Sequence, residues 1–158
     1  MFLAVAPGVV AGLIPWSLTH WRSRGGSASW LPVRIVGGLM IAAGAVVLLQ
    51  AFVRFVTEGV GTPAPVAPTE RLVVGGLYRY VRNPMYLAVT TAILGQALLL
   101  LRPVLLAYGT VAWLTMAAFS HWYEEPALTR QFGASYEEYR RTVPAWLPRW
   151  RSGRPPTP

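Results

Sequence analysis

Residues 75–87 read GGLYRYVRNPMYL, and the rest of the chain is arranged around this stretch. It places two arginines, three tyrosines and the Asn83-Pro84 step directly before a long uncharged run. Arginine costs a few kcal/mol at the centre of a bilayer, so we expect this cluster at a membrane face or in a polar pocket beside it. Asn83 is a good N-cap and Pro84 suits the first helical position, so a helix is expected to begin here.

The composition predicts an all-α, polytopic membrane protein. Of the 158 residues, 54% are hydrophobic and only 13% are charged. At roughly 1.5 Å per residue, four uncharged runs each approach the ~30 Å hydrocarbon core of a bilayer. We therefore predict one membrane domain, residues 1–158, with a cytosolic or interfacial helical tail at 121–150 and four transmembrane helices at 1–19, 35–53, 84–101 and 103–120.

The joins between these runs predict how the helices meet. A polar loop is expected from His20 to Arg34, and the proline-rich segment 59–68 reads as an extended connector. Arg102-Pro103 leaves only a tight turn between the third and fourth runs, so these two helices should form a hairpin. The open ends of a hairpin return to one face, which predicts that Tyr86 lies near Glu124 and Glu125.

Small residues in the second run predict close helix packing. Gly37, Gly38 and Gly44 lie among alanines and valines, which is typical of a packed interior helix. The same glycine-rich face allows a helix-packed homodimer.

The tail is predicted to contain two short helices. Pro126 opens the first and Gly133 ends it. The order Ser-Tyr-Glu-Glu at 135–138 is typical of a capping box that starts the second, which continues to about Thr142. Aromatic and apolar residues after it are expected as interfacial anchors: Trp146, Leu147 and Trp150.

Arginine counts predict the orientation. With four spans, residues 54–82 and the tail lie on one side and carry ten of the fourteen arginines. Positive-inside counting places that side, and with it both termini, in the cytosol. The arginines flank apolar runs and do not form one basic stripe, so membrane lipid is the expected counter-charge and nucleic acid is not an expected partner.

Several chemistries are excluded by the residues present. The absence of cysteine excludes disulfides, thiolate metal sites and a cysteine nucleophile. No phosphate-binding loop or dinucleotide fingerprint is present, and with two histidines and no aspartate we predict no metal site. The remaining candidates for binding are a cluster of tyrosines, arginines and glutamates, and these side chains suit a small zwitterion. The simpler alternative is that Glu124 and Glu125 face water and pair with Arg130.

The motif before the third run and the motifs after the fourth run together resemble one family. GGLYRYVRNPMYL at 75–87, EEPAL at 124–128, FGASY at 132–136, Tyr139 and Val143-Pro144 are similar, in order and spacing, to the isoprenylcysteine carboxyl methyltransferase and phospholipid methyltransferase superfamily. The resemblance covers residues 70–148, roughly half the chain. It implies an integral-membrane methyltransferase that uses S-adenosyl-L-methionine and a lipophilic small-molecule acceptor, which enters from the bilayer between helices.

The resemblance also implies which residues form the site. Arg82 and Glu125 would orient the cofactor or an acceptor carboxylate, and are our candidates for catalytic residues. Cofactor binding is implied for a larger set: Tyr80, Arg82, Asn83, Pro84, Tyr86, His121, Glu124 and Glu125. Many members carry histidine where this chain has Asn83, and asparagine cannot titrate near neutrality, so no proton-transfer role is assigned.

Two other readings stay open. Membrane sterol and steroid reductases resemble this superfamily in their C-terminal hairpin, but they use NADPH. A small membrane scaffold or lipid-binding protein with a decayed site is the non-enzymatic alternative. The acceptor also stays open among a prenylcysteine carboxylate, a phospholipid amine, a small thiol, and a lipid or quinone hydroxyl.

Overall fold

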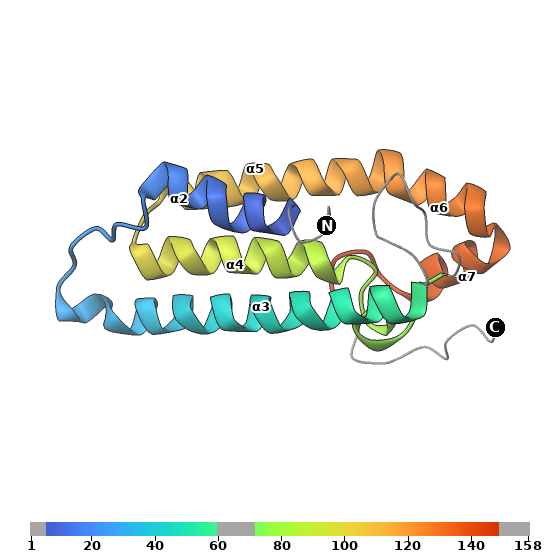
Figure 1. The fold of residues 1–158 in the computed structure, drawn as a ribbon, viewed down its shortest axis with the longest axis horizontal. Helices are drawn as coiled ribbons and strands as arrows, with labels where there is room; N and C mark the ends of the chain where they lie inside the picture. Colours follow the sequence, from blue (N-terminus) through green and yellow to red (C-terminus); the bar gives the residue numbers. More distant parts are fainter. Residues whose placement is uncertain (1–5, 60–71, 149–158) are drawn as a thin grey trace.

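The computed structural model describes residues 6–59 and 72–148, and every regular element in these two ranges is helical (Figure 1). The predicted all-α class is therefore confirmed. Residues 1–5, most of the predicted proline-rich connector (60–68) and Trp150 lie outside the described ranges. The elements in chain order are η1 (Val9–Leu13), α2 (Ile14–Thr19), η2 (Ala28–Trp30), α3 (Leu31–Gly59), η3 (Gly76–Arg79), α4 (Pro84–Leu100), α5 (Val104–Phe119), η4 (Ser120–Glu124), α6 (Glu125–Phe132) and α7 (Ala134–Thr142).

The core of the molecule is an antiparallel arrangement of α3, α4 and α5 (Figure 1). The most extensive packing is between α3 and α4. The short helix α2 lies beside α5 at the end where α4 finishes, while α6 and α7 extend the opposite end (Figure 1). This places the motif before α4 and the acids after α5 at the same end, as the hairpin predicted.

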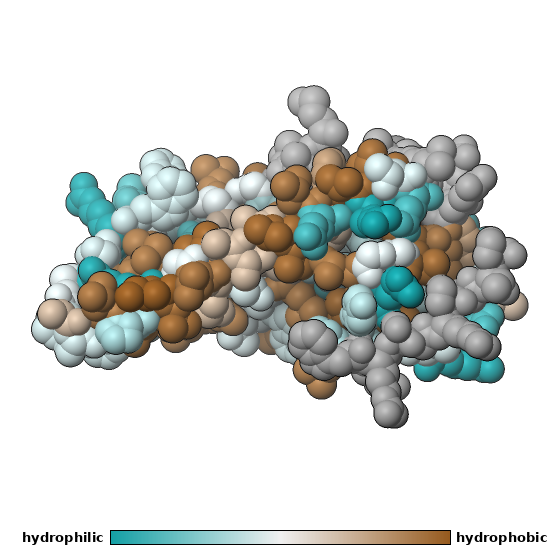
Figure 2. Space-filling view, turned by 90° about the horizontal axis from the view of Figure 1, so that it is seen from below, coloured by the Kyte–Doolittle hydropathy of each residue, from teal (hydrophilic) through white to brown (hydrophobic). Residues whose placement is uncertain are grey.

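Within residues 6–59 and 72–148, two helices are long and apolar enough to cross a membrane: Ala28–Glu58 and Val104–Phe132. Only 17% of the most apolar window of each is buried inside the molecule, so their hydrophobic side chains face outward. Figure 2 shows this for one face, on which hydrophobic residues run along the molecule and hydrophilic residues gather toward its ends. The helices Ala6–Thr19 and Pro84–Leu100 are apolar but shorter, so four spans stay a prediction.

The helix boundaries correct two predictions. The loop expected from His20 to Arg34 is shorter, because η2 and α3 begin at Ala28 and Leu31. Pro32 does not prevent this, since the first turn of a helix has no partner for the missing N–H. The fourth run does not stop near Ser120 either: α5 continues through the π turn η4 into α6.

The tail contains the two predicted helices, but the predicted capping box is wrong. Gly133 ends α6 with a positive φ of 52° and is also the N-cap of α7. The N–H of Glu137 donates to the carbonyl of Gly133, so Ser135 already lies inside the helix. A glycine that can adopt this backbone conformation joins the two helices more tightly than a serine cap would.

Glycines set the distance between α3 and α4. A Cβ atom on Gly37 would lie 2.6 Å from the carbonyl oxygen of Gly95, and one on Gly44 would lie 2.8 Å from that of Ala88. The predicted close packing is therefore present at Gly37 and Gly44. It is absent at Gly38, where a Cβ would meet nothing within 4 Å, and much of the outer face of α3 is exposed. The prediction of an interior helix is wrong for that face.

A proline explains why the first helix is held to the hairpin by polar side chains. Pro15 has no N–H to donate to a carbonyl of the preceding turn, which here is the π turn η1. Two carbonyls of that turn accept side-chain hydrogen bonds instead: Val10 from the hydroxyl of Tyr108 and Ala11 from Nε2 of Gln96, both at 2.7 Å. Neighbouring helices thus satisfy backbone groups in an apolar environment.

Adding one methyl group at Gly37 is expected to destabilise the protein, whereas the same change at Gly38 is not. Gly37→Ala must push α3 away from the backbone of α4, and overpacking of this kind costs about 1–3 kcal/mol. Gly38→Ala points into open space and should be neutral or slightly stabilising, because alanine is the better helix former. Thermal unfolding of both variants in detergent measures the difference, and equal stability would contradict the packing described.

Candidate functional site

The stretch before α4 is fastened to the end of α3. The N–H of Gly75 donates to Oε2 of Glu58 at 3.0 Å, and Oε1 of Glu58 pairs with Arg54 at 2.9 Å. Gly76 has a φ of +55°, and a Cβ atom added to it would lie 3.0 Å from the side chain of Arg54. This glycine lets the chain turn closely past α3 and enter η3.

The other side of the stretch is fastened to the segment after α7. The N–H of Arg82 donates to the carbonyl of Pro144 at 2.9 Å, and Nδ2 of Asn83 donates to that of Ala145 at 3.3 Å. Oδ1 of Asn83 accepts from the hydroxyl of Ser120, also at 3.3 Å. Asn83 does mark the start of α4, but its side chain does not cap the helix. It connects three segments that are distant in sequence.

A largely buried charge pair lies at the centre of this region. Nη1 of Arg82 is 2.7 Å from Oε1 of Glu125, and the two side chains are only 12% and 14% exposed. The same Nη1 donates to the hydroxyl of Tyr136 at 3.2 Å. Nε of Arg82 is buried and has no hydrogen-bond acceptor within the described residues. The pair therefore leaves one guanidinium donor unused.

Glu124 makes a second contact across the hairpin. It accepts a 2.6 Å hydrogen bond from the hydroxyl of Tyr86, which confirms the predicted proximity of these residues. The ring of Tyr86 stacks on Trp146, whose other neighbour is the ring of Trp113 in an edge-to-face arrangement. Trp146, predicted as an interfacial anchor, is half-buried against these rings, whereas Leu147 is 80% exposed, and anchoring at a membrane face stays a prediction for both.

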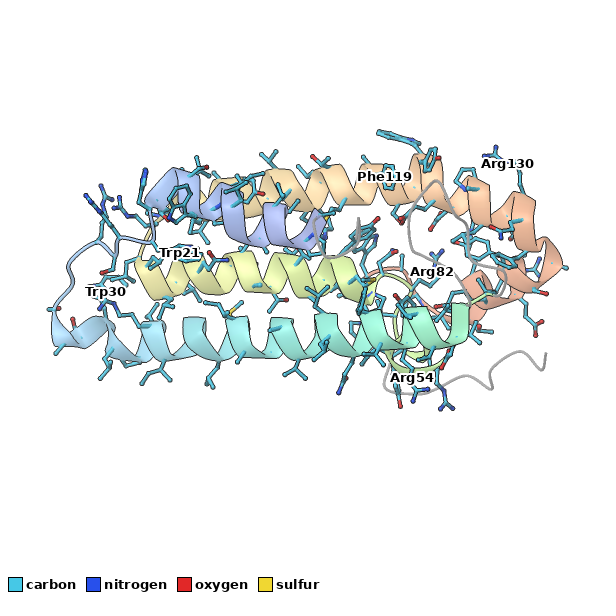
Figure 3. All side chains as sticks on the ribbon, in the orientation of Figure 1. Trp21, Trp30, Arg54, Arg82, Phe119 and Arg130 are labelled. Atoms are coloured by element: carbon cyan, nitrogen blue, oxygen red, sulfur yellow. The ribbon has the colours of Figure 1, made fainter. Side chains whose placement is uncertain are left out.

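The structure thus brings together most of the predicted site, namely Arg82, Asn83, Pro84, Tyr86, Glu124 and Glu125. Two predicted residues lie at its margin. His121 is 71% exposed, with Nδ1 3.5 Å from Oε2 of Glu125. Tyr80 is exposed, and its side chain makes no hydrogen bond to another described residue. The expected pairing of the two glutamates with Arg130 is replaced by the contacts to Arg82 and Tyr86. Figure 3 labels Arg82 beside the end of α3 and Arg130 on α6.

Burial determines the ionisation of the surrounding groups. It raises the pKa of Glu124, which lies beyond the apolar part of its helix, although hydrogen bonds from Tyr86 and Ser120 act in the opposite direction. Burial also raises the pKa of Tyr78 and of Tyr139, whose hydroxyl donates to the carbonyl of Tyr78 at 2.7 Å. Both tyrosines therefore stay neutral at physiological pH, and the hydroxyl of Tyr139 acts as a hydrogen-bond donor. Among the described residues, no three His, Cys, Asp or Glu side chains gather as metal ligands would.

Sequence reasoning missed three contributors to the site. Tyr136 contacts Arg82, Ser120 contacts Asn83, and Trp146 covers Tyr86. Tyr136 had a signal, because it ends the FGASY motif, but spacing alone gave it no partner. Ser120 and Trp146 had no such sequence signal. A serine at the end of an apolar run and a tryptophan near a membrane face are both common without any role in a binding site.

Comparison with known proteins identifies the family. The family model for phospholipid methyltransferase matches residues 33–135, which is more than half of the chain. The chain therefore belongs to the phospholipid methyltransferase family. The matched range runs from α3 to the start of α7 and includes both Arg82 and Glu125.

One curated relative also has the name of a methyltransferase. The chain is similar to protein-S-isoprenylcysteine O-methyltransferase of Schizosaccharomyces pombe, with 40% identity over 80 residues. The aligned region covers 49% of this chain and 33% of that enzyme, so the chain spans about a third of the length of the relative it matches. No solved structure matches the chain significantly.

Removing one member of the central charge pair is expected to destabilise the fold. Arg82→Ala leaves Glu125 largely buried without its cation, which costs about 3–5 kcal/mol. The matched control is Arg140→Ala, because Arg140 lies 3.8 Å from Glu137 with both side chains well exposed, and exposed pairs contribute about 0–1 kcal/mol. Unfolding of the detergent-solubilised variants by SDS titration measures both values. Equal losses would show that the Arg82–Glu125 pair is no more important than a surface pair.

Proposed function

We propose that the chain is an integral-membrane methyltransferase that uses S-adenosyl-L-methionine to methylate a lipophilic acceptor. The observation that carries this proposal is the joining of the two family motifs. Arg82 with Glu125 and Tyr86 with Glu124 form one site from residues on both sides of the hairpin. Family membership and the similarity to an isoprenylcysteine O-methyltransferase support the reaction type.

The residues present fit this cofactor, which carries a carboxylate, an ammonium group, ribose hydroxyls and a sulfonium cation. The buried Nε of Arg82 lacks an acceptor among the described residues and suits the carboxylate. Glu124 and Glu125 suit the ammonium group or the ribose hydroxyls. The stacked rings of Tyr86 and Trp146 suit the cation, because aromatic faces attract positive charge. The chain would therefore hold the cofactor with Arg82, Tyr86, Glu124 and Glu125, with Asn83 and Pro84 shaping the start of α4.

The role of these residues is to position the reactants. When bound, the cofactor would supply an electrophilic methyl group, whose carbon would bond to the acceptor nucleophile as its bond to sulfur breaks and S-adenosylhomocysteine leaves. Arg82 and Glu125 hold each other at 2.7 Å, and Tyr136 fixes the guanidinium from a third side. Such fixed geometry accelerates a two-reactant step without proton transfer. Asn83 is held by Ala145 and Ser120 and contributes orientation, not a base.

The position of the site explains how the two substrates would meet. It lies where α4 begins and α5 ends, at the end of the apolar surfaces of the hairpin (Figure 1). A water-soluble cofactor and a membrane-dissolved acceptor can both reach such an interface. We place this end in the cytosol because six of the ten arginines in the described ranges lie there or in the tail. The acceptor class is an isoprenylcysteine carboxylate or a phospholipid.

Purified protein is expected to bind S-adenosyl-L-methionine and S-adenosylhomocysteine saturably. Glu125→Gln should weaken this binding at least tenfold, because it removes a charge from the site while its amide oxygen can still accept from Arg82. The matched control Glu137→Gln changes the same group on the exposed face of α7 and should bind as the wild type does. Isothermal titration in detergent, with circular dichroism to verify folding, makes this comparison.

The same titration separates the proposal from its two rivals. Binding of NADPH alone would assign the chain to the reductases. No binding of any of these ligands to folded protein would favour a scaffold. Equal affinity of Glu125→Gln, Glu137→Gln and the wild type would remove Glu125 from the cofactor site.

A further inference from the structure

The end of the molecule opposite the candidate site carries a group of arginines that the proposed reaction does not use. It consists of Arg22 and Arg24 in the loop after α2, Arg34 near the start of α3 and Arg102 in the turn between α4 and α5. We call these four residues the far-end arginine cluster. Figure 3 labels two tryptophans of the same end, Trp21 and Trp30, well away from Arg82.

The cluster is held in place by hydrogen bonds between its own segments. Nε of Arg102 donates to the carbonyl of Arg22 at 2.9 Å, and Nη2 of Arg34 donates to that of Arg24 at 3.2 Å. The N–H of Arg24 donates to the carbonyl of Leu100 at 3.0 Å. The loop is thus tied to α3 and to the α4–α5 turn, which places the four arginines at the same end of the molecule.

Within the described ranges, no acidic side chain lies at this end of the molecule. The stretches that build this end, residues 6–57 and 84–123, contain no aspartate or glutamate. Five of the six glutamates lie in described segments at the other end or in the tail, and the sixth, Glu70, lies outside the described residues. Like charges at one end of a molecule repel one another, and no described acid offsets them, so a bound anion would stabilise the far-end arginine cluster.

The surroundings of the cluster indicate which molecule that is. Trp16, Trp21 and Trp30 are exposed beside it, and exposed tryptophans are typical of the headgroup level of a membrane. The helix α4 separates the cluster from Arg82 by 17 residues, which is about 25 Å at 1.5 Å per residue and close to the thickness of the hydrocarbon core. When the candidate site lies at one membrane face, the cluster lies at the headgroups of the other.

We propose that the far-end arginine cluster binds the phosphate of an anionic phospholipid in the leaflet opposite the candidate site. Guanidinium groups bind phosphate oxygens in paired hydrogen bonds, and the exposed tryptophans contact the glycerol and upper acyl region of the same lipid. The bound lipid neutralises the cluster and holds α2, α3 and the α4–α5 turn at a fixed depth in the membrane. This inference does not depend on the identity of the cofactor or acceptor.

Lipid-dependent thermal stability of the full chain tests the proposal. Protein in a neutral detergent is melted with increasing phosphatidylglycerol or phosphatidylcholine, and phosphatidylglycerol is expected to raise the melting temperature more. In the double variant Arg22→Gln/Arg24→Gln, the backbone carbonyls that accept from Arg102 and Arg34 remain, so the fold should persist. Each lost arginine weakens attraction to an anionic headgroup about fivefold, so half-maximal stabilisation should need about 25-fold more phosphatidylglycerol.

The matched control is Arg140→Gln/Arg141→Gln, which removes the same charge from exposed positions on α7. This variant should keep the wild-type response to phosphatidylglycerol. The proposal is overturned if phosphatidylglycerol and phosphatidylcholine stabilise the wild type equally, or if both double variants lose the response to the same extent. Inorganic phosphate is tested alongside, and an equal stabilisation by that ion would replace the lipid with an anion from the aqueous phase.

Discussion

The contact between Arg82 and Glu125 joins segments 43 residues apart, and the architecture of the candidate site depends on it. It forms because α4 and α5 are of nearly equal length and the chain turns sharply between them at Arg102. The end of α5 therefore lies level with the start of α4. A pair with so little exposure is stable only when its remaining hydrogen-bonding groups are satisfied. Tyr136 meets part of that requirement, and a ligand carboxylate would meet the part that Nε of Arg82 leaves open.

The sequence predicted the arrangement along the length of the hairpin better than the contacts across it. Run lengths and one tight turn were sufficient to place Tyr86 near Glu124, because a hairpin has few geometric solutions. Helix ends were less predictable. Pro126 does not interrupt the helix, because the π turn η4 lies directly before α6. The N-cap of α7 is Gly133, where the sequence had suggested Ser135. The stacking of Trp146 on Tyr86 could not be predicted, because it depends on how the chain returns after α7.

Asn83 shows how one position can serve both fold and site. A residue at the first position before a helix is usually explained by its bond to that helix, yet this side chain bonds to Ser120 and Ala145 instead. It therefore fixes the end of α5 and the segment after α7 against the start of α4. An imidazole could make similar bonds, but its charge would vary near neutral pH, whereas an amide keeps the geometry constant.

The π turn at Ser120–Glu124 has a consequence for how this region can vary between related chains. Consecutive residues of an α-helix point about 100° apart, yet Glu124 and Glu125 both reach partners near the start of α4. The extra residue of the π turn sets the rotation of α6 relative to α5, as the comparable turn before Pro15 does in the first helix. Loss or gain of a single residue before Glu124 would rotate both acids by about 100° relative to α5 and away from their partners. The length of the helix between the two motifs is therefore constrained independently of which side chains the helix carries.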